Sequence, residues 1–424
     1  MKLTEQEKRM RGGAQGPVAA EALDYIIQLG EAFGAEQLAD ISYCHYPAEM
    51  GIYEGAVEDL VQYAGRKARV CVPTTTSTLC ADLEKPWITG IPKKLAGLQA
   101  KVEAAHRSMG ILETYTCTPQ LIGFVPPFGS YIASVESSAI IYFNSVLGAR
   151  TNRGGLFSRY SAITGKYPLM GYLLPGNRYG THLFKVRIPP DRLKTYDAWC
   201  ALGFAIGKIV GSEVPVIEGV APHRTDWLIG LGAALATSGS VTLFHIPGVT
   251  PEARTVKEAF GNKRIPKTVY EIKARDLDEV YYQMNTIPSG ADIDFVTLGC
   301  PHYNLAQIKY VAQQLDGKRI APGVNFWVCT NRMTRRQAEY SGYVKIIEKA
   351  GAKVVADTCP VESHMRISTC REYGLPVPYV KNMVMDSVKM ARYVKDLLGC
   401  RTVLTDTDRC IKAALKGKHV SRFS

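Results

Sequence analysis

Hydrophobic positions in the last third of the chain alternate between two periodicities. Apolar, β-branched runs typical of buried strands occur at 294–299, 324–330 and 353–358. Apolar residues at helical spacing separate these runs, over 304–315 and 334–352. Such strand–helix alternation predicts parallel strands with helices packed outside. Right-handed crossovers would then bring the carboxyl ends of the three strands to one edge, where open α/β sheets bind their ligands.

The rest of the chain gives weaker structural signals. Helical spacing recurs at 19–35 and 91–109, and residues 68–75 resemble a strand that enters a loop. Between residues 119 and 155 the chain is rich in Gly, Ser and Pro and poor in charge, which is typical of loops around a site. The length of 424 residues favours two or three α/β domains.

One long uncharged segment tests whether the chain crosses a membrane. Residues 227–250 contain no Asp, Glu, Lys or Arg, and their number alone would allow a membrane span. Ser238, Gly239 and Ser240 divide the segment, and His245 and Pro247 interrupt its second half. We therefore expect a buried helix followed by a buried strand, in a protein that does not enter a membrane.

Charge and cysteine content narrow the class of protein. The net charge of +12 suggests nucleic-acid binding, but the positive residues are dispersed and accompany no zinc-finger or RNP-like motif. A site for an anionic substrate explains the excess better. The 11 cysteines are scattered, and the first residues lack the apolar run of a signal peptide. Reduced thiols in the cytoplasm are the expectation.

The cysteines that follow the predicted strands are candidates for binding a metal. Cys300 follows the first strand and Cys359 the third, each with proline next, and Cys329 lies near the end of the strand between them. No CxxC pair exists, which argues against a zinc ribbon. A cluster with three cysteine ligands needs no close spacing, and its open iron acts as a Lewis acid. The alternative is that both are ordinary half-buried cysteines.

Longer motifs add a resemblance to a known family. The block at 133–153, ASVESSAIIYFNSVLGARTNR, is highly specific. Together with shorter motifs it resembles the large subunit of aconitase X, a divergent branch of the aconitase superfamily, over about 43–417. The shorter motifs are TCTPQ at 116–120, TSGSVTLFHIPGVTPEA at 237–253, LGCPH at 298–302, ADTCPV at 356–361 and MDSVKMARY at 385–393.

This resemblance implies an α/β protein with an aconitase-like fold and hydro-lyase activity. Three α/β domains would surround a central cleft, and the C-terminal one would be a doubly wound parallel sheet. The implied cofactor is an iron–sulfur cluster, 2Fe-2S or 4Fe-4S. A separate small subunit, the swivelling domain, would be the partner and would supply a catalytic serine. The expected domains are 1–155, with a polar site loop, 156–285, and 286–424, with the cluster cysteines.

The resemblance also implies a set of site residues. Cys300 and Cys359 match the cluster-ligand positions, Cys410 is the favoured third ligand, and Cys117 is its alternative ahead of Cys329. The predicted catalytic residues are Glu136, Ser137 and His302. The predicted substrate-binding residues are Asn144, Ser145, Arg150, Thr151, Asn152, Arg153, Ser387 and Lys389.

Chemistry gives these assignments a rationale and also alternatives. Arginine suits a bidentate carboxylate, and a carboxylic acid can protonate a leaving hydroxyl. Glu136 is equally explained by a buried ion pair with an arginine, and His302 by a place at a helix N-terminus.

The resemblance leaves the substrate open. Cis-3-hydroxy-L-proline, dehydrated to a pyrroline-2-carboxylate, is the leading substrate. The stretch at 41–55, together with Met385 and Asp386, departs from the pattern of enzymes that act on it. Mevalonate 5-phosphate is the alternative, because its phosphate needs more cationic contacts and the excess positive charge of the chain could supply them. A hypothesis of another class is an iron- or redox-sensing protein that binds nucleic acid.

Overall fold

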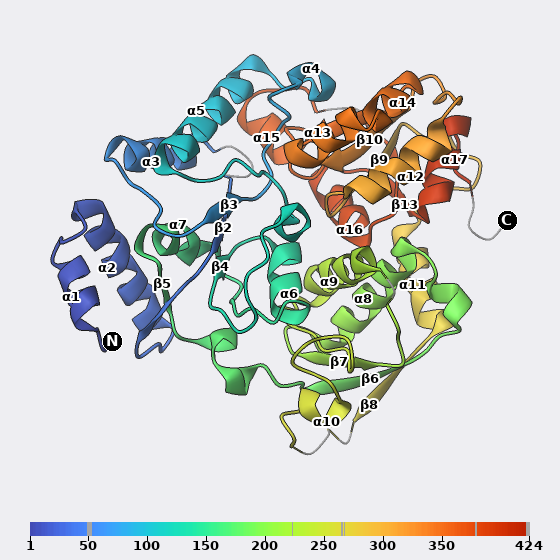
Figure 1. Cartoon of the computed structure of the whole chain (residues 1–424). Coiled ribbons are helices and arrows are strands. Elements are labelled where there is room, and N and C mark those ends of the chain that lie inside the picture. The colour runs from blue at the N-terminus through green and yellow to red at the C-terminus, as the bar shows by residue number, and fades with distance from the viewer. Residues whose placement is uncertain (49–52, 223, 264–265, 267, 378–379, 421–424) are drawn as a thin grey trace.

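The chain forms three α/β units, each built around a parallel sheet (Figure 1). In this computed structural model the described residues are 1–48, 53–222, 224–263, 266, 268–377 and 380–420, without the side chain of residue 156. The N-terminal unit is blue to teal in Figure 1, the middle unit green to yellow, and the C-terminal unit orange to red. The three parallel sheets share no strand, and helices join and cover them.

The N-terminal unit contains a small parallel sheet of order β3-β2-β4. Its strands are β2 (Cys44–Tyr46), β3 (Thr74–Thr76) and β4 (Ala133–Ser134), and β1 (Leu38–Asp40) pairs antiparallel with β5 (Lys166–Pro168). The helices are α1 (Glu5–Arg11), α2 (Pro17–Ala32), α3 (Glu54–Gly65), α4 (Pro86–Thr89), α5 (Lys93–Met109), η1 (Pro119–Ile122), α6 (Ser137–Ser145) and α7 (Gly155–Thr164). The predicted helices at 19–35 and 91–109 are confirmed as α2 and α5.

The predicted strand at 68–75 is much shorter than expected. Only Thr74–Thr76 pairs as a strand, because Pro73 has no N–H to contribute to a ladder. The carbonyl of Pro73 still accepts a hydrogen bond from the Cys44 N–H at 3.0 Å, just before the strand begins. Sequence periodicity alone therefore extended this strand too far toward the N-terminus.

The middle unit has a parallel sheet of order β7-β6-β8. Its elements are η2 (Gly171–Leu173), η3 (Pro175–Asn177), β6 (His182–Arg187), η4 (Pro190–Leu193), α8 (Tyr196–Val210), β7 (Pro215–Glu218), α9 (Thr225–Gly239), α10 (Val256–Ala259), β8 (Val269–Lys273) and α11 (Ala274–Met284). The buried helix predicted within 227–250 is α9. The predicted strand after it is a buried extended segment with one bridge, between His245 and Val216. Among the described residues, no helix has the length and apolar character needed to cross a membrane.

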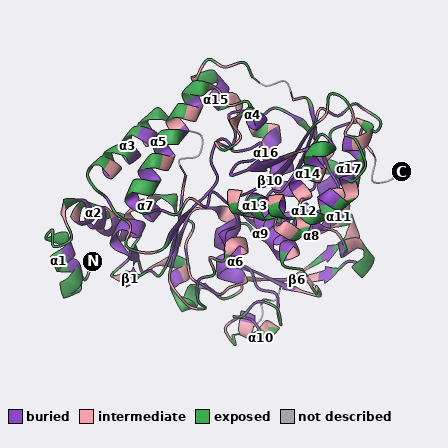
Figure 2. Ribbon diagram, turned by 45° about the horizontal axis from the view of Figure 1, so that its top comes forward, coloured by how far each residue is buried: buried purple, intermediate pink, exposed green. Residues whose placement is uncertain are grey.

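The C-terminal unit is a doubly wound parallel sheet of order β11-β10-β9-β12-β13. Figure 2 shows its strands buried and the outer faces of its helices exposed. The strands are β9 (Phe295–Leu298), β10 (Asn325–Thr330), β11 (Lys353–Ala356), β12 (Asn382–Met385) and β13 (Arg401–Leu404). The helices are α12 (Leu305–Leu315), α13 (Arg332–Tyr340), α14 (Tyr343–Lys349), α15 (Ile367–Glu372), α16 (Val388–Leu397) and α17 (Thr407–Lys416).

Most of the predicted pattern of this unit is confirmed, with two differences. The three predicted strands are β9, β10 and β11, and β12 and β13 extend the sheet beyond them. The single helix predicted at 334–352 is two helices, α13 and α14. They are separated at Gly342, whose φ of 77° is left-handed and cannot continue a right-handed helix.

A buried ion pair fastens the N-terminal unit to the C-terminal unit. The Arg335 guanidinium on α13 donates to the Asp82 carboxylate, and both side chains are fully buried. Asp82 also accepts a hydrogen bond from the Ala356 N–H at 3.2 Å, at the end of β11. These contacts hold the loop after β3 against the carboxyl edge of the large sheet, which becomes one wall of the site described below.

We expect Arg335→Met to destabilise the protein by about 3–5 kcal/mol, because it leaves the Asp82 carboxylate buried without its cation. The shift in the urea unfolding midpoint measures this loss. Arg336→Met is the matched control on the same helix, since the Arg336 side chain is 59% exposed and should change the midpoint little. Equal shifts for the two variants would contradict the role given to Arg335.

Candidate active site

Four chain segments bring thiols and charged groups to the carboxyl edge of the C-terminal sheet. Cys300 follows β9, Cys359 follows β11, Lys389 lies in the first turn of α16 after β12, and Glu136 precedes α6. Gly299 has a φ of 96°, and a Cβ there would clash with the carbonyl oxygen of Cys329. Glycine is therefore required where β9 turns to place Cys300 at this edge.

An ion pair between Lys389 and Glu136 is the electrostatic centre of the site. The Lys389 Nζ donates to Glu136 Oε1 at 2.6 Å, to Ser137 Oγ at 3.2 Å and to Ser138 Oγ at 3.0 Å. Glu136 is also the N-cap of α6 and accepts from the Ser138 N–H at 3.2 Å. Glu136 therefore forms a buried ion pair, which was the alternative expected from the sequence, but its partner is a lysine and not an arginine.

Both members of this pair are charged at neutral pH. Burial alone would raise the pKa of Glu136, but the Lys389 ammonium outweighs it and lowers the pKa to about 2. Burial would lower the pKa of Lys389, and the Glu136 carboxylate instead raises it above its ordinary value. An ionised Glu136 can accept a hydrogen bond or a proton, whereas the protonated acid considered from the sequence is disfavoured.

Cys117, Cys300 and Cys359 lie in segments that meet at His302, whose N–H donates to the Cys117 Sγ at 3.2 Å and whose Nε2 is 3.2 Å from the Thr358 carbonyl. Each of the three cysteines is 8% exposed. Burial raises the pKa of Cys300 to about 11, and Lys389 and a hydrogen bond from Ser387 limit the increase. Burial also raises the pKa of Cys117 and of Cys359, and the Glu136 carboxylate raises that of Cys117 further, as Cys300 does for Cys359.

The structure does not bring Cys410 to this group. Alternate residues of a strand face opposite sides of a sheet, and the Cys410 side chain packs with Val296 and Val384 on one face. Cys300 and Cys359 belong to the apolar cluster on the other face. The Cys410 Sγ donates to the Thr405 carbonyl at 3.7 Å. The motif around Cys410 therefore reflects helix packing, and the observed geometry favours Cys117.

Cys329 lies nearer but is directed differently. It is fully buried within β10, and its Sγ is 3.8 Å from Thr297 Oγ1. Burial raises its pKa to about 12. A thiol inside the strand ladder has less freedom to reach a cofactor than thiols in the loops that follow β9 and β11.

The three clustered thiols fit an iron–sulfur cluster better than a single metal ion. Among the described residues, no three His, Cys, Asp or Glu side chains are placed to hold one ion. A cluster spreads its thiolate ligands over two or more irons, and backbone N–H groups commonly donate to those sulfurs. The bond from the His302 N–H to Cys117 is of this kind. Cys117, Cys300 and Cys359 are the residues that could hold such a group.

Both ring nitrogens of His302 contact polar atoms of the protein. Its Nδ1 is 3.3 Å from Thr116 Oγ1, and its Nε2 is 3.2 Å from the Thr358 carbonyl. Burial lowers its pKa to about 4, so the ring is neutral. His302 therefore ties the segments of Cys117 and Cys359 to the β9 loop, and neither nitrogen is free to reach a substrate.

The block after α6 is mostly engaged in holding the chain together. Asn144 Nδ2 donates to the Thr151 and Thr242 carbonyls, and its Oδ1 accepts from the Thr151 N–H and from Arg178. Ser145 Oγ accepts from the Phe244 N–H at 2.9 Å. These contacts give Asn144 and Ser145 structural roles instead of the predicted substrate contacts.

The remaining predicted substrate residues differ in what they contact. The Asn152 side chain bonds the Met170 carbonyl and the Tyr172 N–H, Thr151 bonds the Asn152 carbonyl, and Arg153 is exposed. Arg150 makes one long ion pair, 3.9 Å to Glu252. Ser387 caps α16 by accepting from the Met390 N–H at 3.3 Å. Of the predicted set, Ser387 and Lys389 lie next to the thiols and Glu136.

The sequence analysis did not select two residues that contact Lys389 and His302. Ser138 accepts a hydrogen bond from Lys389, and Thr116 contacts His302, although neither was selected. Their positions next to Ser137 and Cys117 were the available signal. Part of the departing stretch at 41–55, residues 49–52, lies outside the described residues.

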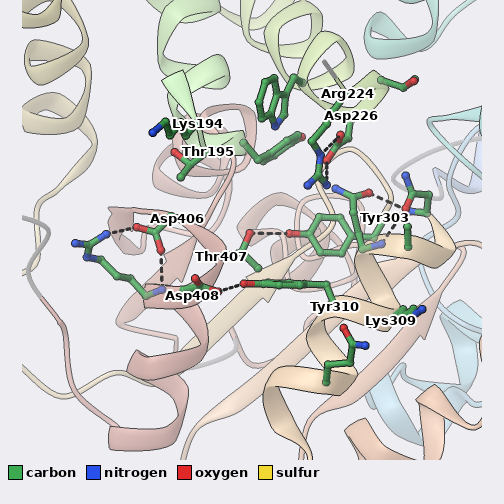
Figure 3. A pocket seen from close by; sticks show the side chains of 18 of the residues that line it. Lys194, Thr195, Arg224, Asp226, Tyr303, Lys309, Tyr310, Asp406, Thr407 and Asp408 are labelled. Atoms are coloured by element: carbon green, nitrogen blue, oxygen red, sulfur yellow. Dashed lines mark hydrogen bonds and ion pairs between the residues drawn. The ribbon is translucent and has the colours of Figure 1, made fainter. Parts of the chain in front are cut away.

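A cavity of about 890 Å³ lies between the middle and C-terminal units, and Figure 3 shows the side chains that line it. Its lining includes Lys194, Arg224 and Tyr303, and none of the clustered thiols, Glu136 or Lys389. Arg224 is paired with Asp226 at 2.8 Å. Tyr196, also in the lining, donates to the Cys300 carbonyl at 3.2 Å. The cavity lining is rich in charged side chains but contains no cysteine, whereas the thiols lie at the sheet edge.

Comparison with known proteins identifies the family. The family descriptions "Aconitase X first domain", "Aconitase X second domain" and "Aconitase X third domain" match residues 1–175, 180–282 and 293–416. The crystal structure of aconitase X from Thermococcus kodakaraensis, in its holo-form, superposes with a TM-score of 0.83 and 31% identity. The superposed region covers 98% of this chain and 100% of the Thermococcus chain.

The relatives are named for two different dehydratase activities. The phosphomevalonate dehydratase large subunit of Methanothermobacter thermautotrophicus is 35% identical over 407 residues, which cover 95% of this chain and 96% of that protein. The cis-3-hydroxy-L-proline dehydratase of Hypocrea jecorina is 30% identical over 427 residues, which cover 98% of this chain and 69% of that protein.

The fold and these relatives define a hydro-lyase with an aconitase-like architecture of parallel α/β sheets. Within that class, the chain belongs to the aconitase X family. The predicted family, fold class and enzyme class are thereby confirmed. Several relatives are named as large subunits, so proteins of this family can work with a separate small subunit.

Proposed function

We propose that the chain is the iron–sulfur-dependent large subunit of a two-subunit dehydratase, with cis-3-hydroxy-L-proline as its substrate. The observation that carries this proposal is the placement of Cys117, Cys300 and Cys359 beside the Lys389–Glu136 ion pair. Thiol ligands and ionised groups at one sheet edge are what a metal-assisted loss of water requires.

Cys117, Cys300 and Cys359 would hold the cluster. A bound cluster would supply a Lewis acid that coordinates the substrate hydroxyl and makes it a better leaving group. Ser387 supports this edge, since its hydrogen bond to Cys300 favours the thiolate.

Glu136 and Lys389 would orient the substrate. One oxygen of Glu136, Oε1, accepts from Lys389 and Ser138, and no described residue bonds to the other, Oε2. Glu136 Oε2 is thus available to accept a hydrogen bond from the substrate. The Lys389 ammonium would stabilise negative charge that grows on the substrate as the proton next to its carboxylate is removed. A serine of the small subunit would be the base that removes this proton.

The charge balance of the site favours a substrate without net charge. Lys389 is neutralised by Glu136, and near Cys359 the Arg366 guanidinium is neutralised by Glu362 at 2.6 Å. Cis-3-hydroxy-L-proline carries one ammonium and one carboxylate. Its ammonium suits Glu136 Oε2, and its carboxylate suits donors opposite that atom. Mevalonate 5-phosphate would bring a carboxylate and a phosphate into a site whose charges already cancel.

One observation supports mevalonate 5-phosphate as a second candidate. The buried Arg150 Nε has no hydrogen-bond partner in the described residues, and the side chain makes only one long ion pair. An arginine whose Nε–H is unpaired can donate two parallel hydrogen bonds to a phosphate. Relatives named phosphomevalonate dehydratase large subunit also match this chain over nearly their full length. Nothing in the described structure favours the nucleic-acid-binding alternative.

The relatives also support a partner chain. The large subunits match this chain almost end to end, whereas the matched part covers only 69–70% of the two cis-3-hydroxy-L-proline dehydratases. The additional third of those proteins corresponds in size to one further domain. We propose that a separate small subunit provides that domain and closes the site.

The test is anoxic co-expression of this chain with its small subunit, followed by visible absorbance and assays of both substrates. We expect iron–sulfur absorbance and loss of water from cis-3-hydroxy-L-proline, with little turnover of mevalonate 5-phosphate. The reverse preference would assign the second function. A colourless complex that dehydrates either compound would contradict the role of the cluster, and a coloured complex inactive on both would contradict both substrates.

A further inference from the structure

A row of three polar residues crosses the sheet of the N-terminal unit. His45 in β2 is paired in register with Thr75 in β3 on one side and with Ser134 in β4 on the other. Paired residues of neighbouring strands present their side chains on the same face. The preceding row, with Cys44 and Ala133, packs into the apolar core of this unit. The row of His45 therefore faces the opposite way, out of that core.

This polar row leads to the proposed site. Glu136 lies two residues beyond Ser134 in extended backbone, so its side chain points to the same side as that of Ser134. Burial lowers the pKa of His45 to about 4, and the Glu136 carboxylate partly opposes this. His45 in turn helps to lower the pKa of Glu136. The imidazole is thus neutral.

Hydrogen bonds fix the orientation of His45. Its Nδ1 is 2.8 Å from Thr75 Oγ1, which also bonds the Tyr43 hydroxyl. A phenol is a stronger acid than an alcohol, so we assign the Tyr43 proton to the bond with Thr75. Thr75 then donates its own proton to Nδ1 of His45. The remaining imidazole proton is left on Nε2, which becomes a donor.

Two polar atoms of this row have no partner. His45 Nε2 and Ser134 Oγ are buried and make no hydrogen bond with any described residue. Unsatisfied buried polar groups are costly and rare in folded proteins, and they often mark a position filled by a ligand or water. Both atoms lie on the side of the sheet toward which Glu136 points, and no described residue bonds to Glu136 Oε2. The three atoms provide a donor, a hydroxyl and an anionic acceptor together.

We propose that His45 Nε2–H and the Ser134 hydroxyl bind the carboxylate of the substrate, opposite Glu136. This assignment rests on the proposed function. These two neutral groups can donate hydrogen bonds to a carboxylate, whereas the ionised Glu136 would repel it. They therefore fix which end of the substrate faces away from Glu136. They make no bond in the reaction, and act by holding the carbon that loses its proton in place. Both candidate substrates contain such a carboxylate.

Two substitutions of His45 separate binding from structure. In His45→Gln the side-chain amide reaches the position of Nε2 and keeps the donor. In His45→Asn the amide reaches only the position of Nδ1, so it keeps the bond to Thr75 and loses the donor. Ser134→Ala removes the second atom. Thr74→Val is the control on β3, since the Thr74 hydroxyl bonds the Val72 carbonyl.

The measurement is steady-state kinetics of the two-subunit holoenzyme with the substrate that the wild type dehydrates, together with cluster absorbance. We expect KM to rise roughly ten- to a hundred-fold in His45→Asn and severalfold in Ser134→Ala, as for a lost hydrogen bond to a charged group. The rise in KM should be much smaller in His45→Gln than in His45→Asn, because glutamine keeps a donor at the position of Nε2. Cluster absorbance and the heat-denaturation midpoint should not change in any variant.

L-Proline gives a readout that does not depend on turnover. It has the carboxylate and ammonium of the leading substrate but no hydroxyl to lose. If the wild type dehydrates cis-3-hydroxy-L-proline, the inhibition constant of L-proline should rise in His45→Asn as KM does.

Several outcomes would overturn the assignment. Unchanged KM in His45→Asn would do so, as would equal losses in His45→Gln and His45→Asn, which would indicate a packing role. A wild type inactive on both candidate substrates would refute the proposed function, and this inference with it. An active wild type with indifferent variants would refute the His45 assignment alone.

Discussion

Replacing Cys117 by serine is expected to abolish the visible iron–sulfur absorbance of the two-subunit enzyme. Cys300→Ser and Cys359→Ser should have the same effect, because these three thiols are the ones that the fold brings together. Dehydration should fall on the order of a hundredfold or more, since even outer contacts of metal ligands cost 10–100-fold. Iron content and absorbance per complex, measured under anoxic conditions, check the result.

Cys410→Ser is the matched control for this prediction. Cys410 is buried like the other three, but its Sγ bonds the Thr405 carbonyl on the opposite face of the sheet. It should keep the cluster and the activity. Loss of absorbance in Cys410→Ser, with retention in Cys117→Ser, would restore Cys410 as the third ligand and would contradict the site described here.

Replacing Lys389 by methionine is expected to lower kcat by about 10²–10³-fold, the usual cost of removing a charged group that stabilises a transition state. The substitution also leaves Glu136 buried without its cation. Lys395→Met is the control on the same helix, because among the described residues the Lys395 Nζ bonds only the Gln283 carbonyl, at 3.3 Å. An unchanged kcat in Lys389→Met would remove the ion pair from the mechanism.

The Lys389 variant should also change how stability depends on pH. In the wild type the pKa of Glu136 is lowered from near 4.5 to about 2. A lowered carboxyl pKa stabilises the folded protein above the unfolded pKa, and this contribution is lost as the pH falls toward 2. Without Lys389, burial raises that pKa instead. The denaturation midpoint of Lys389→Met should therefore fall, relative to wild type, as the pH rises through the neutral range.

Local periodicity predicted the part of the fold that depends on neighbouring residues. It located β9, β10 and β11, and it placed Cys300 and Cys359 at a common edge. It missed β12 and β13, although they have four residues each, as β9 and β11 do, so strand length does not explain the difference. Their absence from the prediction did not affect the site, since the order of the sheet leaves β9 at its centre.

Contacts between distant segments were harder to predict. The family motifs selected Glu136 and Lys389 separately, but no local pattern shows that residues 253 positions apart form one ion pair. For the same reason Cys410 was ranked above Cys117. A motif shows that a cysteine matters, whereas only the packing of α17 on its sheet shows where the sulfur points.

The segmented origin of the site has a consequence for its biosynthesis. Cys117 is translated well before Cys300 and Cys359. During translation no product that stops short of Cys359 can present all three thiols. Iron delivery should therefore follow synthesis and folding of the C-terminal unit, and the colour of the protein would report that its distant segments have reached their native arrangement.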